Sequence, residues 1–231
     1  MAVLPIQTVA LQAEAAVKKA YMINMFPKIA ALIKSFDFSQ ISSERKVILQ
    51  PLVDFVQSKT SGKSQIRINF ICTHNSRRSH LSQVWAQTAA AYYDLQNIYC
   101  YSGGTEATAV FSSVVETLQQ TGFTIQALSA GTNPVYAIKF ADHEHPVIGF
   151  SKTYSDAFNP VGNFAAVMTC SQADSGCPLI AGAETRIPIT YDDPKAFDGT
   201  VQQEEKYRER SLQIAMEMSY VFSQIKINDS K

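Results

Sequence analysis

The chain lacks several features that would assign it to a specialised class of protein. Its 20 lysine and arginine residues balance 20 aspartate and glutamate residues, so it has no basic excess of the kind that binds nucleic acid. No apolar run approaches the length of a membrane helix, about eighteen residues. The opening MAVLPIQTVAL has no basic segment of the kind that begins a signal peptide. We therefore expect a soluble, cytoplasmic protein that binds neither nucleic acid nor membranes.

Cysteine is also scarce, with four residues in a chain of 231. Four are too few for a secreted disulfide scaffold of this length. They form no Cys-x-x-Cys pair and no zinc pattern with the four histidines. His143 and His145 lie in a polar stretch that we expect to be a solvated hairpin tip. We expect neither a metal nor a cofactor, and each thiol is then either a buried filler or a reactive group.

Glycine is absent from the first sixty residues, and the first of ten is Gly62. Apolar residues recur every three and four positions over 26–36 and again over 48–56, which predicts two helices. Pro51 should kink the second helix or begin a new one. The stretch 12–23 is rich in alanine, glutamate and lysine and also favours helix.

A polar, flexible composition over 58–64 marks the best domain boundary. We therefore divide the chain into a helical N-terminal extension, 1–62, and a catalytic domain, 63–231. No candidate catalytic residue precedes Gly62, so the extension is expected to be dispensable for chemistry. Its apolar helix faces require burial either on the main domain or, through self-association, against a second chain.

Beyond residue 66, short β-rich segments alternate with amphipathic ones. This order predicts an α/β fold, a three-layer doubly wound parallel sheet with helices on both faces. Ligands in such sheets bind at the carboxyl ends of the strands. Cys72, Cys170 and Asp193 each follow a predicted strand, so they are expected to meet at one edge. The expected strands are 66–71, 98–101, 164–169 and 186–190, the expected helix faces are 81–92, 110–118 and 207–225, and a hairpin is expected over 135–150.

The strongest local signal is Cys72-Thr73-His74-Asn75-Ser76-Arg77-Arg78-Ser79, a strand-to-helix turn. Backbone N–H groups of such a loop converge on an anion, and the helix dipole adds partial positive charge. The same field favours the thiolate form of Cys72. Arg78 has a planar fork that can hold two oxygens of an oxyanion, and Ser79 can donate its hydroxyl to the thiolate. Taken alone, the pattern also fits a buried cysteine before a basic helix start.

This segment resembles the CTGNSCRS active-site loop of the low-molecular-weight protein tyrosine phosphatase superfamily, which includes the thioredoxin-coupled arsenate reductases. Asp193-Pro194 is similar to the family's acid loop, although Asp before Pro is also common turn chemistry. The resemblance covers about 66–226 and implies the family's fold. It implies that Cys72 is the nucleophile and Asp193 the general acid. It also implies that the oxyanion is bound by Arg78 together with Thr73, His74, Asn75, Ser76, Arg77 and Ser79.

The chain departs from the family pattern in four places. His74 stands where the family usually has glycine, so a side chain occupies a position that normally needs backbone freedom. Arg77 replaces the second cysteine of the loop and adds positive charge near the oxyanion. The segment 195–197 lacks the tyrosine pair that stacks on phosphotyrosine, and the insertion at 128–160 is longer than expected.

A second motif, Cys170 to Cys177-Pro178, resembles the Cys-x6-Cys-Pro redox segment of the arsenate reductases. A disulfide requires Cα atoms within about 7 Å, so the intervening segment must fold back. The alternative is that Cys170 ends a core strand and Cys177 fills space beneath a loop. Cys100 has no partner motif and is expected to be a buried strand residue.

The favoured hypothesis is reduction of arsenate to arsenite through a Cys72 adduct and a Cys170–Cys177 disulfide that thioredoxin reduces. The alternative enzyme is a phosphatase that hydrolyses phosphomonoesters through a phosphocysteine on Cys72. A third hypothesis is a redox-responsive oxyanion-binding module whose helical extension docks a partner. Arsenate and phosphate share shape and charge, so the loop alone does not discriminate between the two enzymes.

Overall fold

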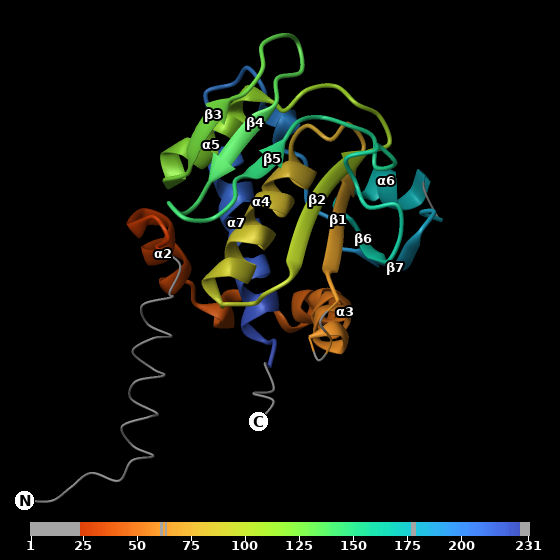
Figure 1. Ribbon diagram of the computed structural model, residues 1–231. Coiled ribbons are helices and arrows are strands. Elements are labelled where there is room, and N and C mark those ends of the chain that lie inside the picture. Colours follow the sequence, from red (N-terminus) through yellow and green to blue (C-terminus); the bar gives the residue numbers. More distant parts are fainter. Residues whose placement is uncertain (1–23, 61, 63, 177–178, 227–231) are drawn as a thin grey trace, which may run out of the picture.

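The central sheet is parallel. The computed structural model describes residues 24–60, 62, 64–176 and 179–226. Within these residues, a four-stranded sheet has the order β2-β1-β6-β7, and every neighbouring pair is parallel (Figure 1). The strands are β1 (Ile66–Cys72), β2 (Ile98–Gly104), β6 (Phe164–Met168) and β7 (Ala183–Pro188). The predicted α/β fold with a parallel sheet is confirmed.

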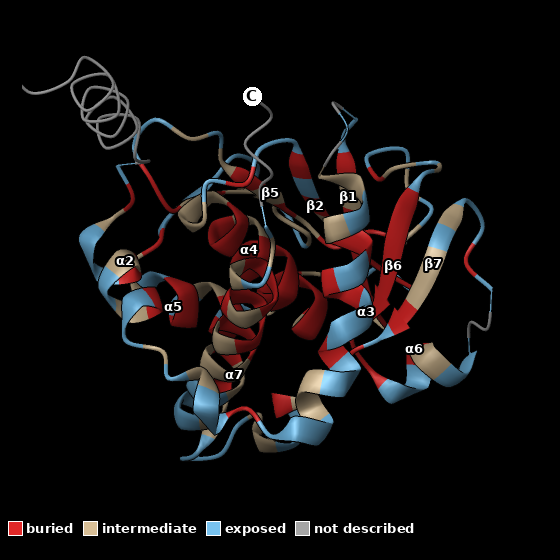
Figure 2. Cartoon of the chain, turned by 90° about the horizontal axis from the view of Figure 1, so that it is seen from below, coloured by how far each residue is buried: buried red, intermediate tan, exposed pale blue. Residues whose placement is uncertain are grey.

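On one face of this sheet, the main hydrophobic core lies between the strands and the helices that pack on them (Figure 2). Alternate strand residues such as Ile68, Phe70 and Val167 point into this core, where they join Trp85 and Met218. The packing follows from the period of two along each strand, which sends successive side chains to opposite faces. The helices that contribute to this core include α4 (Arg78–Tyr92), α5 (Ser112–Thr121) and α7 (Gln203–Ser223).

The opposite face has a thinner cover. It carries a smaller cluster that includes Ile71, Ala166 and Met168, the intervening residues of the same strands. The cluster is closed by α6 (Ser171–Gly176) and by Tyr154 from an irregular segment. Both Cys72 and Cys170 belong to this cluster. The layer on this second face therefore packs on the sheet at the edge where ligand binding is predicted.

The N-terminal part contains α2 (Pro27–Lys34) and α3 (Ser43–Lys59), where the apolar spacing predicts two helices. The short η1 (Phe38–Gln40) between them was not predicted. The α3 helix continues through Pro51, so no new helix begins there. The apolar spacing predicted over 48–56 begins at Ile48, but this start is wrong, because Ile48 is 41% exposed whereas Leu49 is buried. The predicted helix over 12–23 lies outside the described residues.

The described N-terminal helices share the main core with the sheet. Ile29 and Ile33 of α2 and Leu49 and Leu52 of α3 are buried there together with strand residues. The apolar faces of these helices were expected to be buried either on the main domain or against a second chain, and they are buried on the main domain. The division at residue 62 stays a prediction, as does self-association through the N-terminal helices.

A small antiparallel sheet lies beside the helices (Figure 1). Within the described residues it contains β3 (Thr124–Ala127), β4 (Tyr136–Lys139) and β5 (Val147–Gly149). The pairing of β4 with β5 confirms the predicted hairpin, and His143 and His145 are exposed in its connection. β3 was not predicted. None of the described helices is both long enough and apolar enough to cross a membrane.

Candidate active site

The loop between β1 and α4 is held from outside through its carbonyl groups. Segments that follow β2 donate most of these hydrogen bonds: Thr105 N to Cys72 O (3.1 Å), Glu106 N to Thr73 O (2.8 Å), Ser151 Oγ to His74 O (2.9 Å) and Phe111 N to Ser76 O (3.1 Å). By contrast, the N–H groups of residues 74–78 donate to no group in the described part of the chain. A loop with bonded carbonyls and unused N–H groups at a helix start suits an anion.

The predicted insertion supports this loop. Asn133 bonds both backbone groups of Ser151, with its Nδ2 donating to Ser151 O at 2.7 Å and its Oδ1 accepting from Ser151 N at 3.0 Å. Ser151 then donates to the loop at His74 O. Gly104, the last residue of β2, lets this strand lie close to the loop, since a Cβ atom there would lie 2.7 Å from Asn75 N. Residues of the segment 128–160 thus stabilise the loop through hydrogen bonds.

Asn75 and Ser79 orient a donor toward Cys72. Asn75 Nδ2 donates to Ser79 Oγ at 2.8 Å, and Ser79 Oγ lies 3.1 Å from Cys72 Sγ. Because the Ser79 oxygen already accepts one bond, its own proton is available for the sulfur. Lys152 N fixes the other end of the Asn75 amide at 2.9 Å. These hydrogen bonds place the Ser79 hydroxyl beside the sulfur of Cys72, a residue that is 4% exposed.

The expected demand for backbone freedom at His74 is wrong. The positive φ of the loop, 44°, occurs at Asn75, a residue type that tolerates the left-handed region. The imidazole of His74 is turned outward, with Nε2 at 3.7 Å from Glu106 Oε2. A side chain in place of glycine is therefore accommodated without strain, and any contribution of His74 to oxyanion binding comes from its backbone N–H.

A buried titratable pair, His80 and Lys152, lies behind the loop. Burial, and then the charge of Lys152, lower the pKa of His80 to about 3, so this imidazole is neutral at physiological pH. Burial lowers the pKa of Lys152 to about 8. The Lys152 ammonium lies over the rings of Phe150 and Phe158, at 4.3 and 5.2 Å from their centroids. The aromatic rings thus compensate part of its burial.

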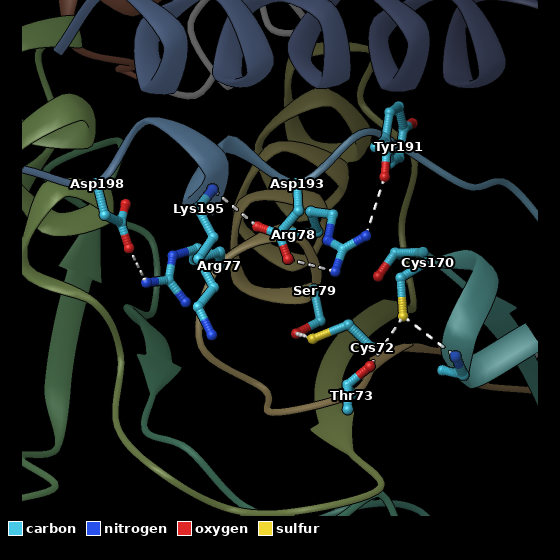
Figure 3. A network of polar contacts seen from close by, with 12 residues as sticks. Cys72, Thr73, Arg77, Arg78, Ser79, Cys170, Tyr191, Asp193, Lys195 and Asp198 are labelled. Carbon is cyan, nitrogen blue, oxygen red and sulfur yellow. Dashed lines mark hydrogen bonds and ion pairs between the residues drawn. The ribbon is translucent and has the colours of Figure 1, made fainter. Parts of the chain in front are cut away.

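Arg78 and Asp193 meet at the edge of the sheet. Arg78 Nη2 lies 2.6 Å from Asp193 Oδ2, and Arg78 Nη1 donates to Tyr191 O at 3.0 Å (Figure 3). Asp193 also accepts a hydrogen bond from Lys195 N at 3.1 Å, which caps η2 (Pro194–Phe197). A pocket opens beside this pair and is lined by Arg78, Ser171, Gln172, Tyr191, Asp192, Asp193, Lys195 and Ala196.

Arg77 turns away from Arg78. Its guanidinium pairs with Asp198 at 2.6 Å (Figure 3). It also donates to Tyr207 Oη and lies 4.0 Å from the centroid of the Phe111 ring. Its charge is thus compensated by Asp198, and the side chain ties the loop to α7. The expected extra positive charge beside the oxyanion is absent from this arrangement. Only the backbone N–H of Arg77 is left for the oxyanion.

Cys170 lies against the other side of the loop. Its Sγ is 3.4 Å from Thr73 Oγ1 and accepts a hydrogen bond from Ala173 N at 3.3 Å (Figure 3). Cys72, Cys100 and Cys170 are free thiols. Cys100 is buried in β2, as predicted, and burial raises its pKa. The predicted partner Cys177 lies outside the described residues, and so does Pro178.

Sequence reasoning missed the residues that position the site from a distance. Asn133, Ser151, Lys152 and Tyr191 carry no motif. The side chains of Asn133 and Ser151 donate to backbone carbonyl groups distant in sequence, whereas Lys152 and Tyr191 use their own backbone groups to bond side chains of the loop. The described residues include no group of three or more His, Cys, Asp or Glu side chains that could hold a metal ion. The chemistry available here is that of thiols, an arginine fork, a carboxylate and backbone N–H groups.

These features describe the class of the protein: it is a doubly wound α/β protein that carries a thiol and an arginine on the loop between a strand and a helix. No protein-family model and no curated protein matches the sequence.

Similar solved structures are low molecular weight phosphotyrosine phosphatases and arsenate reductases. One is a phosphatase from Vibrio cholerae, with 15% identity and a TM-score of 0.45, covering 69% of this chain and 95% of that one. Another is an arsenate reductase in the phosphate binding state, with 17% identity and a TM-score of 0.45, covering 70% of this chain and 100% of that one. A third is an arsenate reductase from Archaeoglobus fulgidus, with 16% identity and a TM-score of 0.45, covering 68% of this chain and 98% of that one.

Alkylation provides a first test of the loop. We expect iodoacetate to modify Cys72 before Cys100, because the Cys72 sulfur lies in the loop that suits an anion and beside the Ser79 hydroxyl, whereas burial raises the pKa of Cys100. Phosphate or arsenate should protect Cys72 by occupying the loop. Peptide mass mapping after limited labelling measures both effects. Faster labelling of Cys100, with no protection by either anion, would show that the loop is not an oxyanion site.

Proposed function

We propose that this chain is an enzyme that reduces arsenate to arsenite, with Cys72 as nucleophile and a dithiol protein of the thioredoxin type as reductant. The observation that carries the proposal is the position of Cys170. A second free thiol lies against the nucleophile loop, bonded to Thr73, and shares one buried cluster with Cys72. A phosphatase mechanism has no use for such a thiol, whereas reduction requires one.

In the first step, the Cys72 thiolate attacks arsenic and an S–As bond forms. The unused N–H groups of residues 74–78 and the Arg78 fork hold the oxyanion. Arg78 pairs with Asp193, and an oxyanion that binds in the loop would take over part of this fork. Asp193, in its protonated form, then gives its proton to the departing oxygen, which leaves as water.

In the second step, Cys170 attacks the sulfur of Cys72. A disulfide forms, the S–As bond breaks, and its electron pair stays on arsenic, so As(V) becomes As(III). Ala173 N at 3.3 Å and Thr73 Oγ1 at 3.4 Å lie within hydrogen-bonding distance of the Cys170 sulfur and orient it for this attack. Cys177 then attacks Cys170, frees Cys72 and leaves a Cys170–Cys177 disulfide. A cytosolic dithiol reductant would reduce this disulfide and close the cycle.

A second candidate is a phosphomonoesterase that uses the same loop, Arg78 and Asp193. The pocket beside Arg78 favours it, because Ser171, Gln172 and Lys195 provide polar groups for the rest of an ester. Among the described residues that line this pocket, the one aromatic is Tyr191, which is buried. A ring-stacking phosphotyrosine site is therefore not supported, and a small or non-aromatic ester fits the lining better.

Turnover by the unmodified protein tests the proposal. We expect arsenite to form from arsenate in the presence of thioredoxin and its reductase, and to form slowly or not at all without them. Hydrolysis of an aryl phosphate, measured on the same preparation, should be the weaker activity. Aryl-phosphate hydrolysis without arsenite production would replace the reductase by the phosphatase.

A further inference from the structure

An ion pair joins the N-terminal helix α3 to α7 close to the general-acid segment. Arg45 forms a two-pronged pair with Glu217, with Nε to Oε1 at 2.9 Å and Nη2 to Oε2 at 2.7 Å. The Glu217 side chain is 3% exposed and that of Arg45 is 19% exposed. Gln213 also donates to Glu217, at 3.0 Å. A pair so well aligned and shielded fixes the guanidinium plane in one place.

The fixed guanidinium faces Tyr191. Its central carbon lies 4.9 Å from the centroid of the Tyr191 ring, which is buried. A cation at this distance from an aromatic ring is attracted to it. Burial, and then the Glu217 carboxylate, raise the pKa of Tyr191, so its hydroxyl stays protonated beside the pair. Arg45 thereby forms part of the wall against which the Tyr191 ring is packed.

The backbone of Tyr191 in turn holds the active site. Tyr191 N donates to Thr169 O at 3.1 Å, and Tyr191 O accepts from Arg78 Nη1 at 3.0 Å. Two residues later, Asp193 pairs with the other branch of the same guanidinium at 2.6 Å. A rotation of Tyr191 would therefore move the carbonyl that orients Arg78 and shift Asp193 with it.

We propose that Arg45 is a positioning residue of the active site, acting through Tyr191 on the orientation of Arg78 and Asp193. The inference rests on the proposed oxyanion function and assigns to the N-terminal helices a part in it. The expectation that residues before Gly62 are dispensable for chemistry then fails at one residue. The contacts of Arg45 are with Glu217 and with the ring of Tyr191, so its effect on the loop after β1 is indirect.

The test separates positioning from stability. Arg45→Met alone would leave the Glu217 carboxylate buried without its partner, which destabilises by itself. The double variant Arg45→Met/Glu217→Gln removes both charges at nearly constant volume. Lys59→Ala is the matched control, because Lys59 of the same helix pairs with Glu184 at 2.7 Å and its ammonium lies over the ring of Phe55 rather than that of Tyr191. Arg45→Lys keeps the cation but loses the fork.

The measurement is the phosphate concentration that half-protects Cys72 from iodoacetate, compared with the melting temperature of each variant. We expect the double variant to need about tenfold more phosphate, the scale on which groups that orient a site through another residue act. Arg45→Lys should need about threefold more, because the cation stays over the ring but without its fork. Lys59→Ala should protect like the wild type, even if its melting temperature falls.

Two results would overturn the inference: a folded double variant with the wild-type phosphate constant, or an equal loss in Lys59→Ala. If the double variant does not fold, Arg45→Lys decides, and an unchanged constant in it counts against a positioning role. A wild-type protein that phosphate does not protect would instead remove the proposed oxyanion function, and the inference with it.

Discussion

Cys72→Ser is expected to abolish turnover of both arsenate and aryl phosphate, by at least about 10⁴-fold, as loss of a nucleophile does in other covalent enzymes. The substitution nearly preserves size, and the serine hydroxyl can still bond to Ser79, which lies 3.1 Å from the present sulfur. The fold should therefore be kept. Steady-state rates with each substrate, together with a melting curve, measure the effect.

Arg78 should be needed for the same two activities. Arg78→Ala removes both the oxyanion fork and the bonds to Asp193 and Tyr191 O. Arg78→Lys keeps a charge but not two parallel donors, and it should also be strongly impaired. Loss of one activity only, in either Cys72→Ser or Arg78→Lys, would show that the two reactions do not share one oxyanion site.

The acid step has a matched control. Asp193→Asn should slow both reactions by about 10²-fold or more, as removal of a general acid does. Asp192→Asn changes the adjacent carboxylate, which is 96% exposed and lies 3.4 Å from Arg210, and it should leave both rates close to those of the wild type. Equal effects of the two substitutions would mean that charge at the pocket, rather than proton donation, is what Asp193 supplies.

The parts of the structure that the sequence predicted are those determined locally. The strand before Cys72 and the turn into α4 follow from a β-rich run and a polar turn, and the structure contains both. The four sheet strands were predicted for the same reason. β3 was missed because it is only four residues long and is largely exposed, so burial gives it no alternating pattern.

The support of the site depends on contacts that no local pattern records. Arg45 and Glu217 are 172 positions apart in the sequence, and Ser151 reaches the loop across 77 positions. Their residue types are ordinary for exposed helices and turns. The need for backbone freedom was expected at His74, where the family usually has glycine. Instead Asn75, whose side chain is bonded at both ends, has the positive φ. Side-chain partners of this kind become visible only when the fold brings them together.

Cys170→Ser is expected to separate the two enzyme hypotheses. A phosphocysteine on Cys72 needs water, Arg78 and Asp193 for its breakdown, so aryl-phosphate hydrolysis should continue at the rate of the wild type. An arsenate adduct needs a second thiol to take up the Cys72 sulfur and leave the electron pair on arsenic. Cys170 is the described thiol in contact with the loop, through Thr73. Multiple-turnover production of arsenite should therefore be lost.

The structure also supplies the control for this experiment. A serine hydroxyl at position 170 can still accept from Ala173 N, so the start of α6 should be preserved. Cys100→Ser removes another buried thiol, in β2, and should leave arsenite production unchanged. Cys177→Ser should act one step later, and mass spectrometry should then find Cys72 and Cys170 joined in a disulfide after a single turnover. If Cys170→Ser produces arsenite as fast as the wild type, the electrons come from elsewhere, Cys170 is only a core residue, and the phosphatase becomes the better account of Cys72, Arg78 and Asp193.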